Sequence, residues 1–240
     1  MGQSIINAFV PCRVGSQRVP GKNTRPFARW PGGLTELKLR QLASVKAVHR
    51  IVLSTDDPEV RRIAARVEKT SRIELSVLER PAHLATADAL DALLTHVAEI
   101  MPDGVIAWTH VTSPFFGASQ MDAAVAAYVA HVENGPFDSL MAVRPIRSFL
   151  WRENDCVSHD RRRVKWPQTQ DLPRFYEVNS ALFMIERVEM LRRLDRVGDR
   201  PFLFETDPIQ GFDIDWPEDF ELAEAIASTM LSRDPAAPAG

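Results

Sequence analysis

Short apolar runs alternate along most of this chain with longer stretches of helical spacing, and this alternation limits the folds that it can adopt. The apolar runs have the length and residue types of strands, and they lie at 5–10, 51–53, 73–78, 105–108, 140–143, 179–185 and 212–214. The stretches with helical spacing lie at 34–45, 58–67, 89–100, 121–132, 186–194 and 217–230. Strands that alternate with helices pair in a mostly parallel sheet with both faces covered. The sequence therefore predicts an α/β fold with a doubly wound, mostly parallel sheet, which binds ligands at the carboxyl ends of its strands.

The alternation is interrupted between Arg144 and Val178, in a stretch that is rich in Pro, Arg, Trp and Asp and has little core periodicity. We therefore expect one α/β domain, made of residues 1–143 and 179–232, with an excursion at 144–178. Aromatic residues in such an excursion are typical of a surface that packs against a second subunit, so we expect a homodimer. The Ala- and Pro-rich end at 233–240 is expected to be disordered. Asp57 and Asp88 stand where N-caps of the helices at 58–67 and 89–100 are expected.

The composition narrows the functional classes. A net charge of −3 over 240 residues favours neither nucleic acid nor an anionic membrane as a partner. No apolar run reaches the roughly 18 residues of a membrane span, and the N-terminus lacks a signal-peptide pattern, so we expect a cytoplasmic protein. The 2 cysteines, Cys12 and Cys156, suit neither a disulfide framework nor a metal site. We interpret Cys12 as a small buried residue at a strand end rather than a reactive thiol.

The loop that follows the first predicted strand combines glycines with cations. Between residues 13 and 29 the chain has basic residues and no acidic one, and the loop contains Arg13, Gly15, Ser16, Arg18, Gly21 and Lys22. Glycines let backbone N–H groups approach an anion, and Arg and Lys neutralise phosphate. The loop lacks both the Walker A pattern and the dinucleotide fingerprint. It indicates either a triphosphate site of another kind or a solvated basic loop.

An acidic segment lies near the other end of the chain. Residues 201–232 include many acids and no Lys or Arg, and Asp213 and Asp215 stand on either side of Ile214. In an extended strand, residues two apart face the same side, so the two carboxylates would form an oxygen site suited to Mg²⁺ while Ile214 enters the core. The alternative is a charged strand end, in which Asp215 caps the helix that begins at Pro217. A magnesium triphosphate needs both a basic and an acidic group of residues.

Several blocks together resemble the acylneuraminate cytidylyltransferases, a family that includes the CMP-sialic acid, CMP-Kdo and CMP-pseudaminic acid synthetases. The first block is Cys12-Arg13-Val14-Gly15-Ser16-Gln17-Arg18-Val19-Pro20-Gly21-Lys22-Asn23, which is similar to the family's opening motif. The later blocks follow in the family's order, and they lie at 52–57, 79–86, 111–114, 170–173, 176–181 and 213–219. The resemblance spans nearly the whole chain and implies a Rossmann-like domain with a smaller dimerisation excursion.

The resemblance implies a CTP-dependent reaction that forms a CMP-activated acidic sugar and releases pyrophosphate. The residues that it assigns to CTP are Arg13, Ser16, Lys22, Asn23, Arg80, Ala85, Thr86 and His110. Asp213 and Asp215 would hold Mg²⁺, and together with Arg13 and Lys22 they are the candidate catalytic residues. Gln170, Tyr176 and Asn179 fall in the stretch that faces the acceptor acid in the family. No side chain stands out as a general base, since a lone histidine such as His110 is more often structural.

The chain departs from the family pattern mainly on the acceptor side. Gln17 stands where the family has Lys, and Arg18 is its basic neighbour. Phe116 replaces a common Arg, and Gln168-Thr169 replace the Arg associated with the acid substrate; Arg161, Arg162, Arg163 and Lys165 lie nearby. The acceptor therefore stays open, and a phosphonate or another non-sugar acid is an alternative. A pyrophosphorylase for another nucleotide and an inactive nucleotide-binding or assembly protein are further alternatives, although the retained Arg13, Lys22, Asp213 and Asp215 argue against the last.

Overall fold

A computed structural model describes residues 4–16, 18–86 and 89–233. Its strands are β1 (Ile6–Pro11), β2 (Arg50–Thr55), β3 (Glu74–Glu79), β4 (Val105–Trp108), β5 (Ser139–Ile146), β6 (Trp151–Arg152), β7 (Asp155–Cys156), β8 (Phe175–Glu186) and β9 (Pro201–Glu205). Its α-helices are α1 (Gly33–Ala43), α2 (Pro58–Glu68), α3 (Leu90–Ile100), α4 (Ala118–Tyr128), α5 (Arg187–Arg193) and α6 (Pro217–Arg233). The shorter turns are η1 (Ala82–Leu84), η2 (Val129–Glu133) and η3 (Thr169–Asp171). The predicted cap Asp88, the position Gln17 and the predicted tail beyond Arg233 lie outside the described residues.

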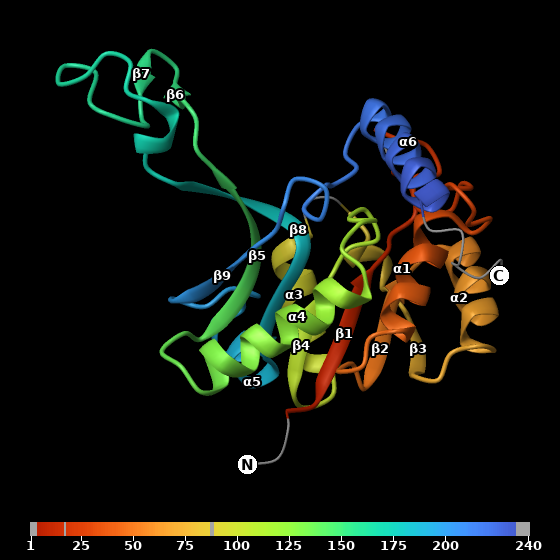
Figure 1. Ribbon diagram of the computed structural model, residues 1–240. Helices are drawn as coiled ribbons and strands as arrows, with labels where there is room; N and C mark the ends of the chain where they lie inside the picture. The colour runs from red at the N-terminus through yellow and green to blue at the C-terminus, as the bar shows by residue number, and fades with distance from the viewer. Residues whose placement is uncertain (1–3, 17, 87–88, 234–240) are drawn as a thin grey trace.

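The main sheet has seven strands in the order β3-β2-β1-β4-β8-β5-β9 (Figure 1). β8 runs antiparallel to both of its neighbours, β4 and β5, and the other strands of this sheet run in one direction. On one side of β1 the sheet continues with β2 and β3, and on the other side it continues with β4, β8, β5 and β9. The carboxyl ends of β1 and β4 therefore lie at the topological switch point, where such sheets bind ligands. The predicted doubly wound, mostly parallel α/β fold is confirmed.

The alternation of side chains along the central strands builds two cores. In β1, Ile6, Ala8 and Val10 pack with residues of α1, α2, α4 and α6, whereas Phe9 packs on the opposite face with residues of α3 and α5. Since successive strand residues point to opposite faces, a strand buried on both sides must be apolar throughout. This is why the central strands read as continuous apolar runs. Every helix in the described part of the chain is too short or too polar to span a bilayer.

The structure corrects several element predictions. Residues 212–214, predicted as a strand, have no regular secondary structure and lie outside the sheet, although Ile214 is fully buried as expected. The edge strand β9 was not predicted, and it pairs in parallel with β5. The helix predicted at 121–132 begins earlier as α4 and continues into the π-helical turn η2. The N-cap prediction for α2 is confirmed, because the Asp57 side chain accepts a hydrogen bond from the backbone N–H of Glu59.

The excursion is shorter than predicted because the strands that lead into it continue. β5 and β8 pair as a ribbon up to Ile146 and Phe175, so residues 144–146 and 175–178 belong to the strands. Residues 147–174 then leave the sheet and form an arm that includes the small β6–β7 hairpin and η3. Figure 1 shows the arm projecting away from the body at the end of the ribbon. We use "the arm" for residues 147–174 below.

Candidate functional site

The loop that follows β1 is held at the carboxyl edge of the sheet by the end of β2. The backbone N–H of Cys12 donates to the carbonyl of Ser54 (2.9 Å), and that of Val14 donates to the Asp56 carboxylate (2.8 Å). Asn23 closes the loop from the other side, since its amide donates to the carbonyl of Arg13 (3.3 Å). Asp56 is a positioning residue that the sequence reasoning did not single out, although its block was part of the family resemblance. Cys12 is buried as predicted, and burial raises the pKa of its thiol to about 12, so the thiol stays protonated.

The basic loop and the acidic segment meet in space, although they are nearly 200 residues apart. The ammonium of Lys22 donates to the carbonyl of Ile214 (2.7 Å), and the guanidinium of Arg18 pairs with the Asp215 carboxylate (2.7 Å). Arg18 also lies over the ring of Trp216, 4.9 Å from its centroid. Burial lowers the pKa of Lys22, whereas Asp213 and Asp215 act in the opposite direction. The fold therefore brings cations and carboxylates together at one edge of the sheet.

Asp213 and Asp215 fit a hard cation, but in different ways. One carboxylate oxygen of Asp213, Oδ1, is buried and has no hydrogen-bond partner among the described residues. Burial raises the pKa of Asp213, the hydroxyls of Thr112 and Ser180 and the Lys22 ammonium oppose that rise, and Asp215 adds to it. A buried carboxylate oxygen without a donor is a poor structural group but a good cation ligand. Within the described ranges no cluster of three or more His, Cys, Asp and Glu side chains could hold a metal, so this pair would need oxygens from a substrate, as Mg²⁺ sites commonly do.

The alternative in which Asp215 caps the last helix is wrong. The side-chain oxygen Oδ2 of Asp219 accepts from the backbone N–H groups of Asp215 (2.9 Å) and Trp216 (2.8 Å), so the side chain that closes the turn into α6 is that of Asp219. The Asp215 carboxylate instead pairs with Arg18 and is half-exposed. Asp215 is therefore free of a capping role and available to a ligand that displaces Arg18.

Two adjoining hollows lie over this edge, and they share Pro11, Arg13, Arg18 and His110. One, of about 330 Å³, is also lined by Ser16, Lys22, Asn23, Val111 and Thr112. The other, of about 370 Å³, is also lined by Arg80, Leu84, Thr86, Ala89, Leu90, Leu93 and Trp108. The first hollow is lined by several cationic side chains, whereas the second has an apolar wall formed by residues of α3. Together they form an elongated site with a charged end and a more apolar end.

Arg80 is buried at the apolar end and supports its wall. Its guanidinium donates to the hydroxyl (3.2 Å) and the carbonyl (2.9 Å) of Ser54, and burial lowers its pKa. Ala85 and Thr86 follow the short turn η1, and Thr86 lines the hollow. A buried guanidinium whose remaining N–H groups face a hollow is suited to a polar ligand edge. Of the residues predicted for the base of the nucleotide, Arg80 and Thr86 line this hollow, whereas Ala85 is not among the described residues that line it.

His110 lies where both hollows meet, but its ring nitrogens are already engaged. The indole N–H of Trp108 donates to Nε2 (3.0 Å), and Nδ1 lies 3.0 Å from the carbonyl of Ser180. This pairing requires the neutral tautomer that carries its proton on Nδ1. Burial lowers the pKa of His110 to about 4, and the charge of Arg196 acts in the same direction. His110 is therefore a neutral structural residue of the wall and unsuited to take a proton from a substrate.

The residues predicted for an acceptor do not gather in one place. Asn179 is buried, and its amide bonds to the hydroxyl of Thr206 (3.0 Å) and to the backbone N–H of Ala181 (3.1 Å). Tyr176 lies on the exposed ribbon, where its hydroxyl reaches Glu205 (3.3 Å). Gln170 lies in the arm and pairs with Gln168. Within one chain, the acceptor-side predictions are therefore spread from the sheet to the arm.

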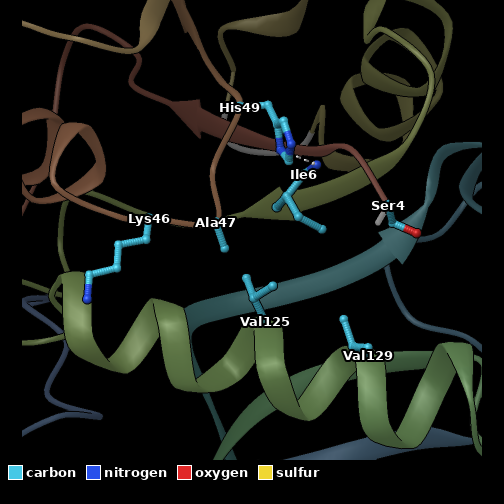
Figure 2. Close-up of a pocket in the computed structure, with 7 residues that line it drawn as sticks. All are labelled: Ser4, Ile6, Lys46, Ala47, His49, Val125 and Val129. Atoms are coloured by element: carbon cyan, nitrogen blue, oxygen red, sulfur yellow. Dashed lines mark hydrogen bonds between the residues drawn. The ribbon is translucent and has the colours of Figure 1, made fainter. Parts of the chain in front are cut away.

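A separate hollow of about 260 Å³ lies at the opposite edge of the sheet, at the amino end of β1 (Figure 2). Val125 and Val129 point from the helix toward Ile6, and the ring of His49 accepts a hydrogen bond from the backbone N–H of Ile6 (3.1 Å). Its lining is mostly apolar, and it contains none of the predicted site residues. The hollows beside the basic loop are therefore the candidate active site.

Comparison with known proteins places this site in a family. A family model described as Cytidylyltransferase matches residues 7–234. Among solved structures, CMP:2-keto-3-deoxy-manno-octonic acid synthetase complexed with CTP matches with a TM-score of 0.66 and 14% identity, over 95% of this chain and 100% of that chain. A 4-diphosphocytidyl-2C-methyl-D-erythritol synthase from Anaerococcus prevotii matches with a TM-score of 0.59 and 12% identity, over 94% of this chain and 99% of that chain.

No curated protein sequence matches the chain significantly. At 14% and 12% identity, the two structural likenesses support the fold, and the family model carries the assignment. The model covers nearly the whole chain, from the second residue of β1 to the end of α6, so it includes the basic loop and the Asp213–Asp215 segment. The chain belongs to the cytidylyltransferase family and is a nucleotidyltransferase enzyme.

Proposed function

We propose that this enzyme transfers CMP from CTP to a small acidic sugar of the nonulosonate or ulosonate type and releases pyrophosphate. The observation that carries the proposal is that the basic loop, which lines the elongated hollow, contacts the segment that carries Asp213 and Asp215. The solved structure with the higher of the two TM-scores is a synthetase for an activated ketodeoxy acid, and it was complexed with CTP. The other belongs to a synthase with a different product, so the acceptor rests on the motif resemblance.

In the proposed reaction an acceptor hydroxyl oxygen attacks the α-phosphorus of CTP, and the bond to the leaving pyrophosphate breaks. The cations that line the hollow, Arg13 and Lys22, bind the triphosphate and oppose the negative charge that grows on it. Ser16 and Asn23 line the same hollow and offer a hydroxyl and an amide to phosphate oxygens. Arg80, with Thr86 beside it, bounds the hollow proposed for the cytosine ring.

Asp213 and Asp215 are the residues that would hold Mg²⁺, and the unpartnered oxygen of Asp213 supports this role. A bound magnesium ion would supply charge stabilisation for the phosphates and would acidify the attacking hydroxyl. In the described structure Arg18 forms an ion pair with Asp215. A triphosphate that attracts Arg18 would therefore free the Asp215 carboxylate. His110 contributes shape rather than proton transfer, because both of its ring nitrogens are engaged.

The experiment is a pyrophosphate-release assay with Mg²⁺, a panel of CTP, UTP, ATP and GTP, and a panel of acceptors. The acceptors are nonulosonic acids, ulosonic acids and phosphonates, and the Asp213→Asn enzyme measures background. We expect CTP to exceed the other nucleotides greatly and an ulosonic or nonulosonic acid to be the active acceptor. Equal turnover with UTP would overturn the cytidine assignment, and turnover with phosphonates alone would overturn the sugar acid.

A further inference from the structure

A lysine lies inside the core directly beneath the candidate site. Lys38, in the middle of α1, is about 1% exposed and is among the largest fully buried side chains. Its ammonium donates to the carbonyls of Ser113 (2.9 Å) and Phe116 (2.7 Å). Its third N–H has no acceptor within the ranges that the structure describes. A buried ammonium is costly unless it is paired and hydrogen-bonded, so this position is poorly explained by packing alone.

The segment that Lys38 holds is the one that supports Asp213. Next to it on α1, the amide of Gln41 donates to the carbonyl of Pro114 (2.8 Å), so the helix fixes the 113–116 turn at successive carbonyls. The same loop continues back to Thr112, whose carbonyl accepts from the backbone N–H of Ile214 (2.9 Å). Lys38 is thus linked through one short loop to the residue that follows Asp213.

The charges point to the same connection. Burial lowers the pKa of Lys38 to about 7, and Asp213 is the charged group that opposes this change. The hydroxyl of Ser113 and Oδ1 of Asp213 are both buried and lack hydrogen-bond partners in the described residues. The hydroxyl of Thr112, which lies in the loop that Lys38 holds, is a side-chain hydrogen-bond partner of the Asp213 carboxylate.

We propose that Lys38 is a positioning residue for cytidylyl transfer, which fixes the 112–116 loop from inside the core and thereby holds the segment that carries Asp213 in place. The inference rests on the proposed magnesium-dependent function. Lys38 touches neither hollow and acts on the reaction only through Asp213 and the loop. Neither the composition nor the motif blocks mark it, because a lysine on an amphipathic helix normally reads as a surface residue.

The first test compares Lys38→Met with Lys38→Gln, and Lys46→Met is the control. Lys46 is an exposed lysine just after the same helix, and its side chain has no place in the site. Mn²⁺ binding in the presence of CTP is measured by electron paramagnetic resonance, and kcat and KM for CTP are measured at matched folded fraction. We expect Lys38→Met to weaken Mn²⁺ binding and kcat by roughly 10- to 100-fold, as loss of groups that orient metal ligands does, with little change in KM.

Lys38→Gln keeps hydrogen-bond donors, so it tests whether the hydrogen bonds to the loop carry the role. We expect it to retain more stability and more Mn²⁺ binding than Lys38→Met. Wild-type Mn²⁺ binding and kcat in Lys38→Met would overturn the inference, and so would a Lys38→Gln variant that is no better than Lys38→Met.

A double-mutant cycle tests the link to Asp213 without metal or turnover. Unfolding by urea is measured for wild type, Lys38→Met, Asp213→Asn and the double variant in metal-free buffer. We expect Lys38→Met to lower the unfolding midpoint less in the Asp213→Asn background, because both residues act on the 112–116 loop. Additive effects would overturn the inference. A wild-type enzyme that neither binds Mn²⁺ nor uses CTP would overturn the proposed function instead, and the cycle would still decide whether Lys38 and Asp213 are coupled.

Discussion

Asp213 and Asp215 are two residues apart and meet different surroundings. Asp213 has a buried oxygen without a partner, whereas Asp215 is half-exposed and paired with Arg18. A carboxylate held in this way without metal is destabilising on its own, and an exposed ion pair contributes little. The pair is therefore better explained by a ligand than by the stability of the fold.

Replacement of either carboxylate should separate activity from stability. If the pair holds Mg²⁺, we expect Asp213→Asn and Asp215→Asn each to reduce kcat by about 100-fold or more, because several kcal/mol of charge stabilisation are lost. Metal-free stability of Asp213→Asn should be equal to wild type or slightly higher, since its burial penalty is relieved. The measurements are kcat against Mg²⁺ concentration and urea unfolding. Near wild-type rates with unchanged magnesium dependence in both variants would remove the metal site.

His110 should make stability depend on pH without limiting catalysis. Its pKa in the folded protein, about 4, lies below the ordinary value of 6.5, so the unfolded chain binds the proton first. Its contribution to stability is then complete above pH 6.5 and is lost as the pH falls toward about 4. Between these two pH values, we expect the free energy of unfolding of wild type to fall by about 2 kcal/mol more than that of His110→Gln. This figure is smaller than the full difference in pKa would give, because the ring borders the hollow. Parallel unfolding curves against pH for the two proteins would contradict this.

At the level of secondary-structure elements, the start of α6 joins the acidic segment to the fold. Asp219 accepts from two backbone N–H groups that precede the helix, and those groups belong to Asp215 and Trp216. The helix cap therefore also fixes the backbone of a candidate metal ligand. A change at this cap should affect both the helix and the site.

Alanine substitution of Asp219 should cost more stability in metal-free protein than alanine substitution of Asp215. Asp219→Ala should reduce the free energy of unfolding by about 1 kcal/mol, because two backbone donors lose their acceptor. Asp215→Ala should change it by less than about 0.5 kcal/mol, because only a half-exposed ion pair is lost. Urea unfolding of both variants side by side is the measurement. A larger loss for Asp215→Ala would return the capping role to Asp215.

For the whole molecule, the arm is the feature that one chain does not account for. Trp166 is 65% exposed and Trp151 is 46% exposed, and Arg161 lies over both rings. Large exposed aromatic residues on a projecting segment are typical of a surface that packs against another molecule. We propose that the arm packs against a second copy of the chain, so that each arm lies near the acceptor pocket of the other subunit.

Trp166→Glu should weaken this assembly. We expect wild type to be a dimer by light scattering at micromolar concentration, and Trp166→Glu to shift toward monomer with reduced turnover, because a charge would be buried in the interface. Leu222→Glu is the matched control, since Leu222 is 52% exposed on α6 and lies outside the arm. A fully active wild-type monomer would refute the dimer.

Features that depend on neighbours along the chain could be predicted from the amino-acid sequence. The alternation of strands and helices predicted the sheet, the cap at Asp57 was readable from its position before Pro58, and the apolar run after Ile5 placed Cys12 in the core. These are properties of strand and helix periodicity and of hydrogen bonds between residues two or three apart. The motif order further indicated the nucleotidyltransferase family, which the family model confirms.

The contacts between residues far apart in the chain depend on the fold and could not be predicted from the sequence. Three hydrogen bonds join residues that are 42, 75 and 197 positions apart. They link Asp56 with Val14, Lys38 with Ser113, and Arg18 with Asp215. Strand β9 was not predicted because a partly exposed edge strand has a weak apolar pattern. The segment at 212–214 was predicted as a strand because a buried Ile214 between two carboxylates has the period of two that a strand has. Sequence periodicity reports which side of an element is buried, whereas hydrogen-bond partners depend on strand order, which brings residues together regardless of their separation in the chain.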